Sequence, residues 1–501
     1  MEAVQHYTAY RPKPFTPAER KDVTVLFGGL TWKHERLLQG AFQNVGYKAE
    51  PLPNVARADL DAGKELIDVG ACCPTTFTTG SLVNFLKGRA ATEGAEAVSK
   101  NYIFVTAGAC GPCRFGQYHE SYTMALDGLG LKDFRLFLLD QTPAEQGSAN
   151  GGGLEIDLPF TLGAVWALLC ADLVTDLEYR TRPYEVVPGS TDQALVEVCE
   201  RLYDAFRKRP SRGKKLGVVA WHLLTNHFTK ALRDVKRRWD LIEIDPLRVK
   251  PRVKITGEFW LQTHEGDGNY DIKRWLEREG AEVIPPPIAI WLDYLAFSGL
   301  LRVKDREHLD PKVKNKVRAL QFGRRVYRYT YDRLRRALGN APAEMPPQEE
   351  LAELAAPYYN FNLDGGEGHM LVGKALYAHL HKHAHMICEL SPYSCMPNTM
   401  SIGAMANVAG KHPDILYAPI EIKGDAEVHA LSRTQMVLSE AKRRATREWE
   451  DVLDRTGVTL DRARRAVAAR PELRRGTYVL PHGGAAGLAA SVVEEVARRR
   501  W

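Results

Sequence analysis

The chain has 501 residues, of which 45% are hydrophobic and 26% charged, and it carries a net charge of +6. This length exceeds what one core can organise, so we expect about two to four domains of ordinary globular composition. The mild charge does not call for nucleic acid, and the best apolar run, Leu158 to Ala171, is shorter than the roughly 20 residues of a membrane span. Because the amino terminus also lacks a signal-peptide pattern, we expect a cytoplasmic protein with no membrane or nucleic-acid partner.

Strand and helix patterns alternate over the first part of the chain. Apolar, β-branched runs predict buried strands, and amphipathic stretches that stop at glycine predict helices. The predicted strands are residues 23–30, 67–71, 102–106 and 134–139, and the predicted helices are 34–45, one opening at 79–81, and 118–129. This alternation predicts a parallel, doubly wound α/β domain over residues 20–145.

The remaining chain divides into three parts. The glycine-rich run 147–153 predicts a linker or mobile loop, followed by a largely helical region over 150–245. A second doubly wound α/β domain is expected over 250–425, beginning near residues 216–219 or 253–257 and carrying a basic helical insertion at 301–338. A charged helical region, 426–501, closes the chain. The predicted fold is therefore two Rossmann- or flavodoxin-like parallel-sheet domains that face each other across a cleft.

Three cysteines stand beside a proline in three separate loops: Cys72, Cys113 and Cys395. Each loop is expected to follow a buried strand, and in open α/β sheets such loops meet at one edge, where ligands bind. Iron–sulfur clusters are held mainly by cysteine thiolates, and a helix amino terminus stabilises a thiolate. Three protein ligands would leave one iron open for a substrate. The pattern favours a cluster, although small buried thiols remain an alternative.

The other cysteines are interpreted separately. Cys110 and Cys113 form a C-x-x-C pair, which also suits zinc or a redox dithiol. Cys73 and Cys110 are candidates for extra ligands or spare thiols. The three that lie within apolar patterns and are expected in the core are Cys170, Cys199 and Cys388.

At these loops the sequence resembles activase-related members of the 2-hydroxyacyl-CoA dehydratase superfamily, the group that includes double-cubane cluster proteins. The matching motifs are CCP with TTG (residues 72–80), GPCRFGQY (111–118), GEG with GK (366–374) and SPYSCMP (391–397). The resemblance extends over residues 20–145 and 250–445. The cysteines at 73 and 110 depart from the family pattern.

The resemblance implies a 4Fe–4S cluster, or a double-cubane cluster across a dimer, with Cys72, Cys113 and Cys395 as ligands. It also implies a homo- or heterodimer and low-potential electrons from a separate ATPase activator that carries its own cluster. ATP would act only through that partner. The better-known enzymes of the family eliminate water from 2-hydroxyacyl-CoA through a ketyl radical.

Other polar residues are candidates for chemistry near such a cluster. Arg114 could stabilise a reduced cluster or bind an anionic substrate, and Glu367 and Glu258 could donate protons. The segment 368–375 has two glycines and a lysine but lacks the hydroxyl of a P-loop, so we expect no nucleotide there. Alternate histidines at 379–385 could suggest zinc, but only pairs four residues apart share a helix face. The basic stretch 301–338 could bind nucleic acid, CoA phosphates or an acidic partner, or be a solvated face.

The sequence therefore predicts an iron–sulfur protein that performs ATP-coupled, low-potential reduction or radical dehydration of a small substrate. Three alternatives remain open at this point. They are a (R)-2-hydroxyacyl-CoA dehydratase subunit proper, a non-catalytic cluster scaffold or electron carrier, and a zinc protein that uses Cys110 and Cys113.

Overall fold

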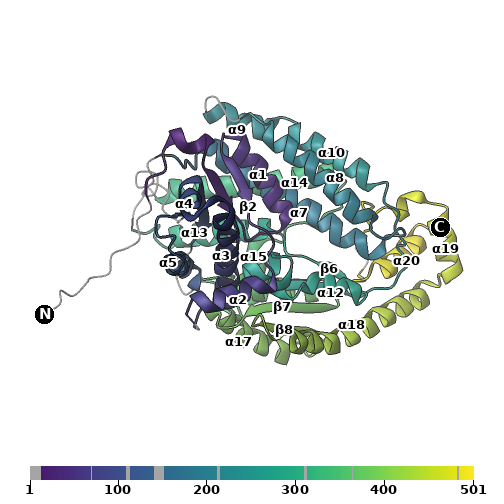
Figure 1. The fold of residues 1–501 in the computed structure, drawn as a ribbon. Coiled ribbons are helices and arrows are strands. Elements are labelled where there is room, and N and C mark those ends of the chain that lie inside the picture. The colour runs from purple at the N-terminus through teal and green to yellow at the C-terminus, as the bar shows by residue number, and fades with distance from the viewer. Residues whose placement is uncertain are drawn as a thin grey trace.

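The computed structural model describes residues 13–68, 70–108, 113–139, 152–210, 215–309, 313–363, 365–481 and 484–501. Its strands form two four-stranded sheets, ordered β2-β1-β3-β4 and β6-β5-β7-β8, in which every pair is parallel. Helices cover both sheets (Figure 1), which confirms the predicted α/β class with two doubly wound parallel sheets. We call residues 17–139 the first lobe and residues 252–422 the second lobe.

The first sheet is buried on both faces because its strands are apolar at successive positions. Leu26 and Phe104 face a core with α3 and α5, whereas Val25 and Ile103 face a core with α1 and α7. The elements of this lobe are η1 (Pro17–Lys21), β1 (Thr24–Phe27), α1 (Trp32–Asn44), β2 (Lys48–Pro51), α2 (Arg57–Leu66), α3 (Cys73–Glu93), α4 (Ala95–Asn101), β3 (Tyr102–Ala107), η2 (Arg114–Gln117), α5 (Tyr118–Gly128) and β4 (Arg135–Leu139).

A helical region joins the lobes, and its elements are α7 (Leu158–Thr181), η3 (Arg182–Tyr184), α8 (Ser190–Arg207), α9 (Lys215–Leu224) and α10 (His227–Trp239). Together with α13 and α14 of the second lobe, these helices enclose a large helical core. One stretch of this region, residues 158–184, is long and apolar enough for a membrane span. However, 67% of its most apolar 18-residue segment is buried inside the fold. Such burial is typical of a core helix.

The second lobe has the same strand order as the first, with a longer helical excursion between its second and third strands. Its elements are β5 (Arg252–Gly257), α11 (Phe259–Thr263), η4 (Asp267–Asn269), α12 (Ile272–Arg278), β6 (Glu282–Ile284), α13 (Ile288–Lys304), α14 (Val313–Ala337), α15 (Gln348–Ala355), α16 (His369–Leu380), β7 (Met386–Pro392), α17 (Met396–Lys411) and β8 (Tyr417–Ile422). The chain ends in α18 (Glu427–Thr456), α19 (Leu460–Ala468), η5 (Pro471–Arg474) and α20 (Leu488–Arg498), which have a core of their own.

Several local predictions were wrong. The described residues of 67–71 form no strand; β2 is instead Lys48–Pro51, whose short, half-polar run gives little periodic signal. Helix α3 begins at Cys73 rather than near residue 79, because a proline fits the first turn of a helix. Residues 216–219 lie in α9, so the second sheet begins with β5. Of the expected linker 147–153, residues 147–151 lie outside the described part, while the carbonyls of Gly152 and Gly153 accept hydrogen bonds from Arg20.

A buried lysine connects the two lobes and the helical region. The Lys33 ammonium of α1 is fully buried and lies 2.7 Å from Glu178 of α7 and 2.5 Å from Glu265, which follows α11. Arg182 extends the network from Glu178, at 2.5 Å, to Glu277 of α12, at 2.9 Å. Burial alone would raise the pKa of Glu178, but the charges of Lys33 and Arg182 outweigh it and hold that pKa at about 2.

Replacing Lys33 with methionine should destabilise the whole chain. The substitution leaves buried carboxylates without their counter-charge, which costs about 3–5 kcal/mol, so the thermal midpoint should fall by roughly 5–10 °C. The exposed Lys87 provides the matched control, and Lys87→Met should change the midpoint by about 1 °C or less. Differential scanning calorimetry measures both midpoints. Equal midpoints would contradict the stabilising role of Lys33.

Candidate functional site

Each of the three predicted cysteines is the N-cap residue of a helix. Cys72 precedes α3, Cys113 precedes η2, which continues directly into α5, and Cys395 precedes α17. In α3 and α17 a proline stands in the first turn. The free N–H groups of such a turn point toward the capping residue and interact favourably with negative charge.

The two lobes present these residues from equivalent places in their folds. Cys113 follows β3, the third strand of the first lobe, and Cys395 follows β7, the third strand of the second. Cys72 caps the first of two helices that lead into β3, and the corresponding helix of the second lobe, α16, is preceded by Glu367. Both lobes thus contribute loops to the site. The loops of Cys113 and Cys395 lie at strand ends, where open α/β sheets bind ligands.

The first-lobe loops are joined to each other through polar contacts. The Cys72 thiol is buried, 3.0 Å from the hydroxyl of Thr75 and 3.2 Å from the hydroxyl of Tyr118, the first residue of α5. The guanidinium of Arg114 donates to the Gly70 carbonyl in the loop before Cys72. Arg114, expected to act on a cluster or substrate, therefore also holds the two cysteine loops together.

The three thiols lie within electrostatic reach of one another. Burial raises the pKa of the Cys395 thiol, and the charges of Glu258, Cys113 and Cys72 raise it further. Burial likewise raises the pKa of Cys113 to about 11, with contributions from Glu258, Cys72 and Glu367. Glu258 thus acts on both of these thiols, and Glu367 acts on Cys113.

Two carboxyl groups at this site have pKa values that burial raises toward neutrality. Glu258 caps α11 and accepts the Leu261 N–H at 2.9 Å, and burial raises its pKa to about 7. Glu367 is 3% exposed; burial raises its pKa to about 7 although the nearby Lys374 opposes this shift. One oxygen of Glu367 accepts from Gln262 at 3.3 Å, and the other has no hydrogen-bond partner among the described residues.

Behind Cys395 lies a polar chain that the sequence analysis missed. The Cys395 thiol lies 3.6 Å from the amide oxygen of Asn398, whose amide nitrogen donates to Glu389 at 3.3 Å. Glu389 is fully buried in β7 and accepts the Tyr417 hydroxyl at 2.5 Å. A carboxylate inside an otherwise apolar strand was the available signal, because buried glutamates are rare unless they have partners.

The position of Cys72 depends on a close crossing of α2 and α3. A Cβ added at Gly80 of α3 would lie 1.7 Å from the Asp59 carbonyl oxygen, and one at Gly63 of α2 would lie 2.0 Å from the Thr76 carbonyl oxygen. The two helices therefore touch through their backbones at both places. This contact explains the glycine in the TTG motif.

The remaining sequence candidates lie elsewhere or have other partners. Cys73 packs into the core of the second lobe, and Cys110 lies outside the described residues, so its pairing with Cys113 stays a prediction. The expected core cysteines Cys170, Cys199 and Cys388 are buried. Three of the four histidines in 379–385 contact separate acids: His379 pairs with Asp414, His381 with Glu350 and His385 with Glu448.

Within the described part of the chain, no group of three or more histidine, cysteine or acidic side chains is arranged around a single metal ion. An iron–sulfur cluster binds its thiolates through separate irons, so its ligands stand farther apart than those of one ion. Three thiols at helix N-caps, with a partner-free carboxyl oxygen beside them, match the donor set of such a cluster. No protein-family model matches the chain, and no curated protein matches its sequence.

Replacing Gly80 with alanine should force α2 and α3 apart. The added methyl group has no room, so we expect a loss of about 1–3 kcal/mol in the free energy of unfolding and weaker retention of any metal held by Cys72. Gly88 lies on the same helix with no described atom within 4 Å of its added Cβ, so Gly88→Ala should be neutral or stabilising. Thermal unfolding of both variants measures the effect. Equal midpoints would contradict the close contact between the backbones of α2 and α3 at Gly80.

In metal-free protein the Cys113 thiol should react slowly with iodoacetamide. With a pKa of about 11 the reactive thiolate is scarce at pH 8, and the rate should rise about tenfold per pH unit up to pH 9.5. Peptide mass spectrometry measures the rate, and urea-unfolded protein supplies the reference. A plateau below pH 9 would show that burial does not raise the pKa of this thiol.

Proposed function

We propose that this chain is a cytoplasmic iron–sulfur protein of the activase-related 2-hydroxyacyl-CoA dehydratase type. In this proposal Cys72, Cys113 and Cys395 hold a 4Fe–4S cluster, or half of a double-cubane cluster in a dimer. The chain would receive low-potential electrons from a separate ATPase activator and pass them to a small substrate. The substrate would be reduced or would lose water through a radical.

The observation that carries this proposal is the convergence of the three thiols from the two lobes. Cys113 and Cys395 follow equivalent strands and all three cysteines cap helices, although Cys72 and Cys395 are more than 300 residues apart in the chain. Convergence of several thiols on one buried site is uncommon unless a metal group binds there. The specific GPCRFGQY motif around Cys113 supports the same assignment.

When bound, the cluster would supply one-electron chemistry and an open iron as a Lewis acid. The protein's own residues would then have three tasks. The helix amino termini would face the thiolates, and the Tyr118 hydroxyl would orient Cys72, while Arg114 would hold the loop of Cys113 to the loop of Cys72. Glu258 and Glu367, with pKa values of about 7, can give up a proton to a leaving hydroxyl or a reduced substrate at neutral pH.

Anaerobic purification tests the cofactor directly. The protein should contain iron and acid-labile sulfide, and the dithionite-reduced form should give an EPR signal of a reduced cluster. Cys395→Ala should lose most of the iron, because one of the three ligands is gone. Cys388→Ala is the matched control: Cys388 is fully buried in the strand that leads to Cys395, and its loss should leave the iron content unchanged.

Two results would overturn the proposal. One is zinc in place of iron in the anaerobically purified protein. The other is iron at the wild-type level in Cys395→Ala, with circular dichroism showing that both variants are folded.

A further inference from the structure

An open groove in the first lobe is separate from the cysteine site, and none of the described residues that line it belongs to that site. The groove lies between α1 and the chain that ends β2 and continues beyond it; Figure 1 shows these two elements side by side. Its volume of about 440 Å³ falls within the range of about 300–1,000 Å³ that small-molecule sites occupy. Because β1 and β2 are parallel, their carboxyl ends meet here, and open α/β sheets bind ligands at such ends.

The walls of the groove suit a flat ring. Trp32, the first residue of α1, packs on the helical core but is only half-buried, and it lines the groove. The other wall is formed by Pro51, Leu52 and Pro53, which end β2 and follow it. An indole ring opposite apolar side chains favours a planar ligand that stacks on the indole.

The fold already balances the charged side chains of the groove. Glu35 is 4% exposed, and one of its oxygens accepts the Leu30 N–H at 3.0 Å. One oxygen of Glu50 lies 2.8 Å from Arg89, and the other accepts no hydrogen bond from any described residue. Arg36 is the single cation among the described residues that line the groove, and Glu200 holds it at 2.6 Å.

This charge balance favours a neutral ligand. Without a free cation the groove offers a phosphate group nothing to pair with, whereas the carboxyl oxygens can accept hydrogen bonds from hydroxyl or amino groups. Burial raises the pKa of Glu35 to about 8, so this carboxyl group is largely uncharged at pH 7 and attracts an organic cation little.

The position of Glu50 indicates which hydroxyl groups it meets. In dinucleotide-binding sheets an acidic residue about 20 residues after the glycine turn accepts hydrogen bonds from a ribose. Glu50 lies in β2, 22 residues after Gly28, which directly follows β1. In those sheets the backbone N–H groups of the glycine turn hold a phosphate, but here the Leu30 N–H of that turn donates to Glu35.

We propose that this groove binds a purine nucleoside that carries no phosphate, with its base stacked on Trp32 and its ribose hydroxyls donating to Glu50. A purine covers more of the indole than a smaller pyrimidine ring does. A phosphate on the ribose would bring a second negative charge beside Glu50. The proposal does not depend on the cluster.

Isothermal titration calorimetry with adenosine, guanosine, AMP and 2′,3′-dideoxyadenosine tests the proposal. At least one of the two nucleosides should bind, and AMP and dideoxyadenosine should each bind at least about tenfold more weakly than adenosine. Trp32→Ala should weaken nucleoside binding about tenfold, because the stacking surface is lost. Glu50→Gln should weaken it by a similar factor and should largely remove the preference for adenosine over dideoxyadenosine.

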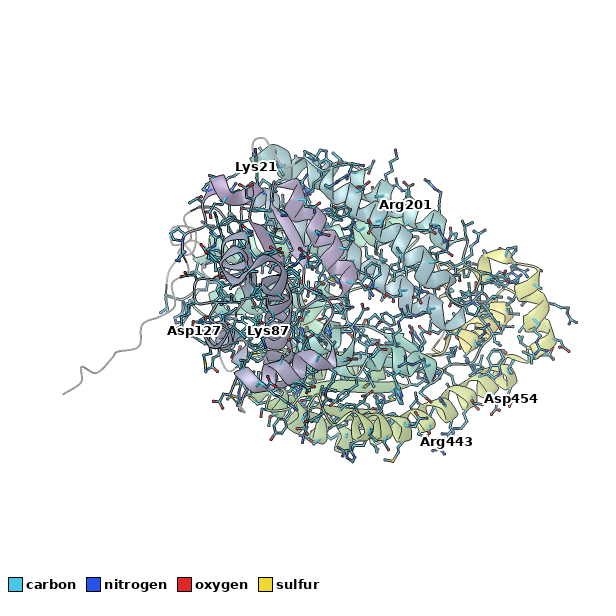
Figure 2. The ribbon with its side chains drawn as sticks, viewed as in Figure 1. Lys21, Lys87, Asp127, Arg201, Arg443 and Asp454 are labelled. Carbon is cyan, nitrogen blue, oxygen red and sulfur yellow. The ribbon has the colours of Figure 1, made fainter. Side chains whose placement is uncertain are left out.

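The control removes a carboxylate elsewhere in the same lobe. Asp127, labelled in Figure 2, is exposed on α5 and does not line the groove. Asp127→Asn should change nucleoside binding by less than about twofold. Circular dichroism checks the folding of every variant, and Glu50→Gln, which alters a partly exposed side chain, keeps the test decisive if Trp32→Ala fails to fold.

Three results would overturn the proposal. The first is no binding of either nucleoside at about 1 mM. The second is nucleoside binding that Glu50→Gln leaves unchanged, which would place the ligand elsewhere. The third is binding of AMP as tight as that of adenosine, which would make the site one for phosphates.

Discussion

The arrangement of the whole chain depends on one buried cation, Lys33. Its ammonium is fully buried and is neutralised by carboxylates from two other parts of the structure, the helix α7 and the loop after α11. A buried charge is tolerated only when its partners are in place, so the first lobe, the helical region and the second lobe have to be docked together for this network to form. The strand ends that carry the cysteines therefore face the site in one fixed arrangement.

Within that arrangement the site follows from the strand order that the lobes share. A parallel sheet places the loop after its third strand in the same relative position in each lobe, and those loops carry Cys113 and Cys395. The lobes differ at the helix that leads into this strand, where the first lobe presents Cys72 and the second presents Glu367. The two lobes therefore share one strand order but contribute different side chains to the site. The first lobe thus contributes two thiols, and the second contributes one thiol and the carboxyl group of Glu367.

Much of this could be predicted from the sequence, and the exceptions have physical reasons. The strands β3, β4, β5 and β7 have long apolar runs that leave little ambiguity, so the fold class followed from them. Strand β2 is short and half exposed, and the run 67–71 resembles a strand only because apolar residues lie close together there. The motif loops pointed to the three cysteines, but Glu389 and Asn398 are brought to Cys395 by strand pairing and helix packing, which a single sequence does not reveal.

The adjacent residues Cys72 and Cys73 have a consequence for how the chain can vary. The side chain of Cys72 packs with the core of the first lobe, whereas the side chain of Cys73 packs with the core of the second. The start of α3 thus lies between the two interiors, since Phe77 also belongs to the second core and Leu82 to the first. An insertion or deletion of a single residue there would displace one interior relative to the other, whereas the longer connections elsewhere can absorb such a change. The fold therefore tolerates an insertion or deletion between Cys72 and Cys73 less well than one in its longer loops.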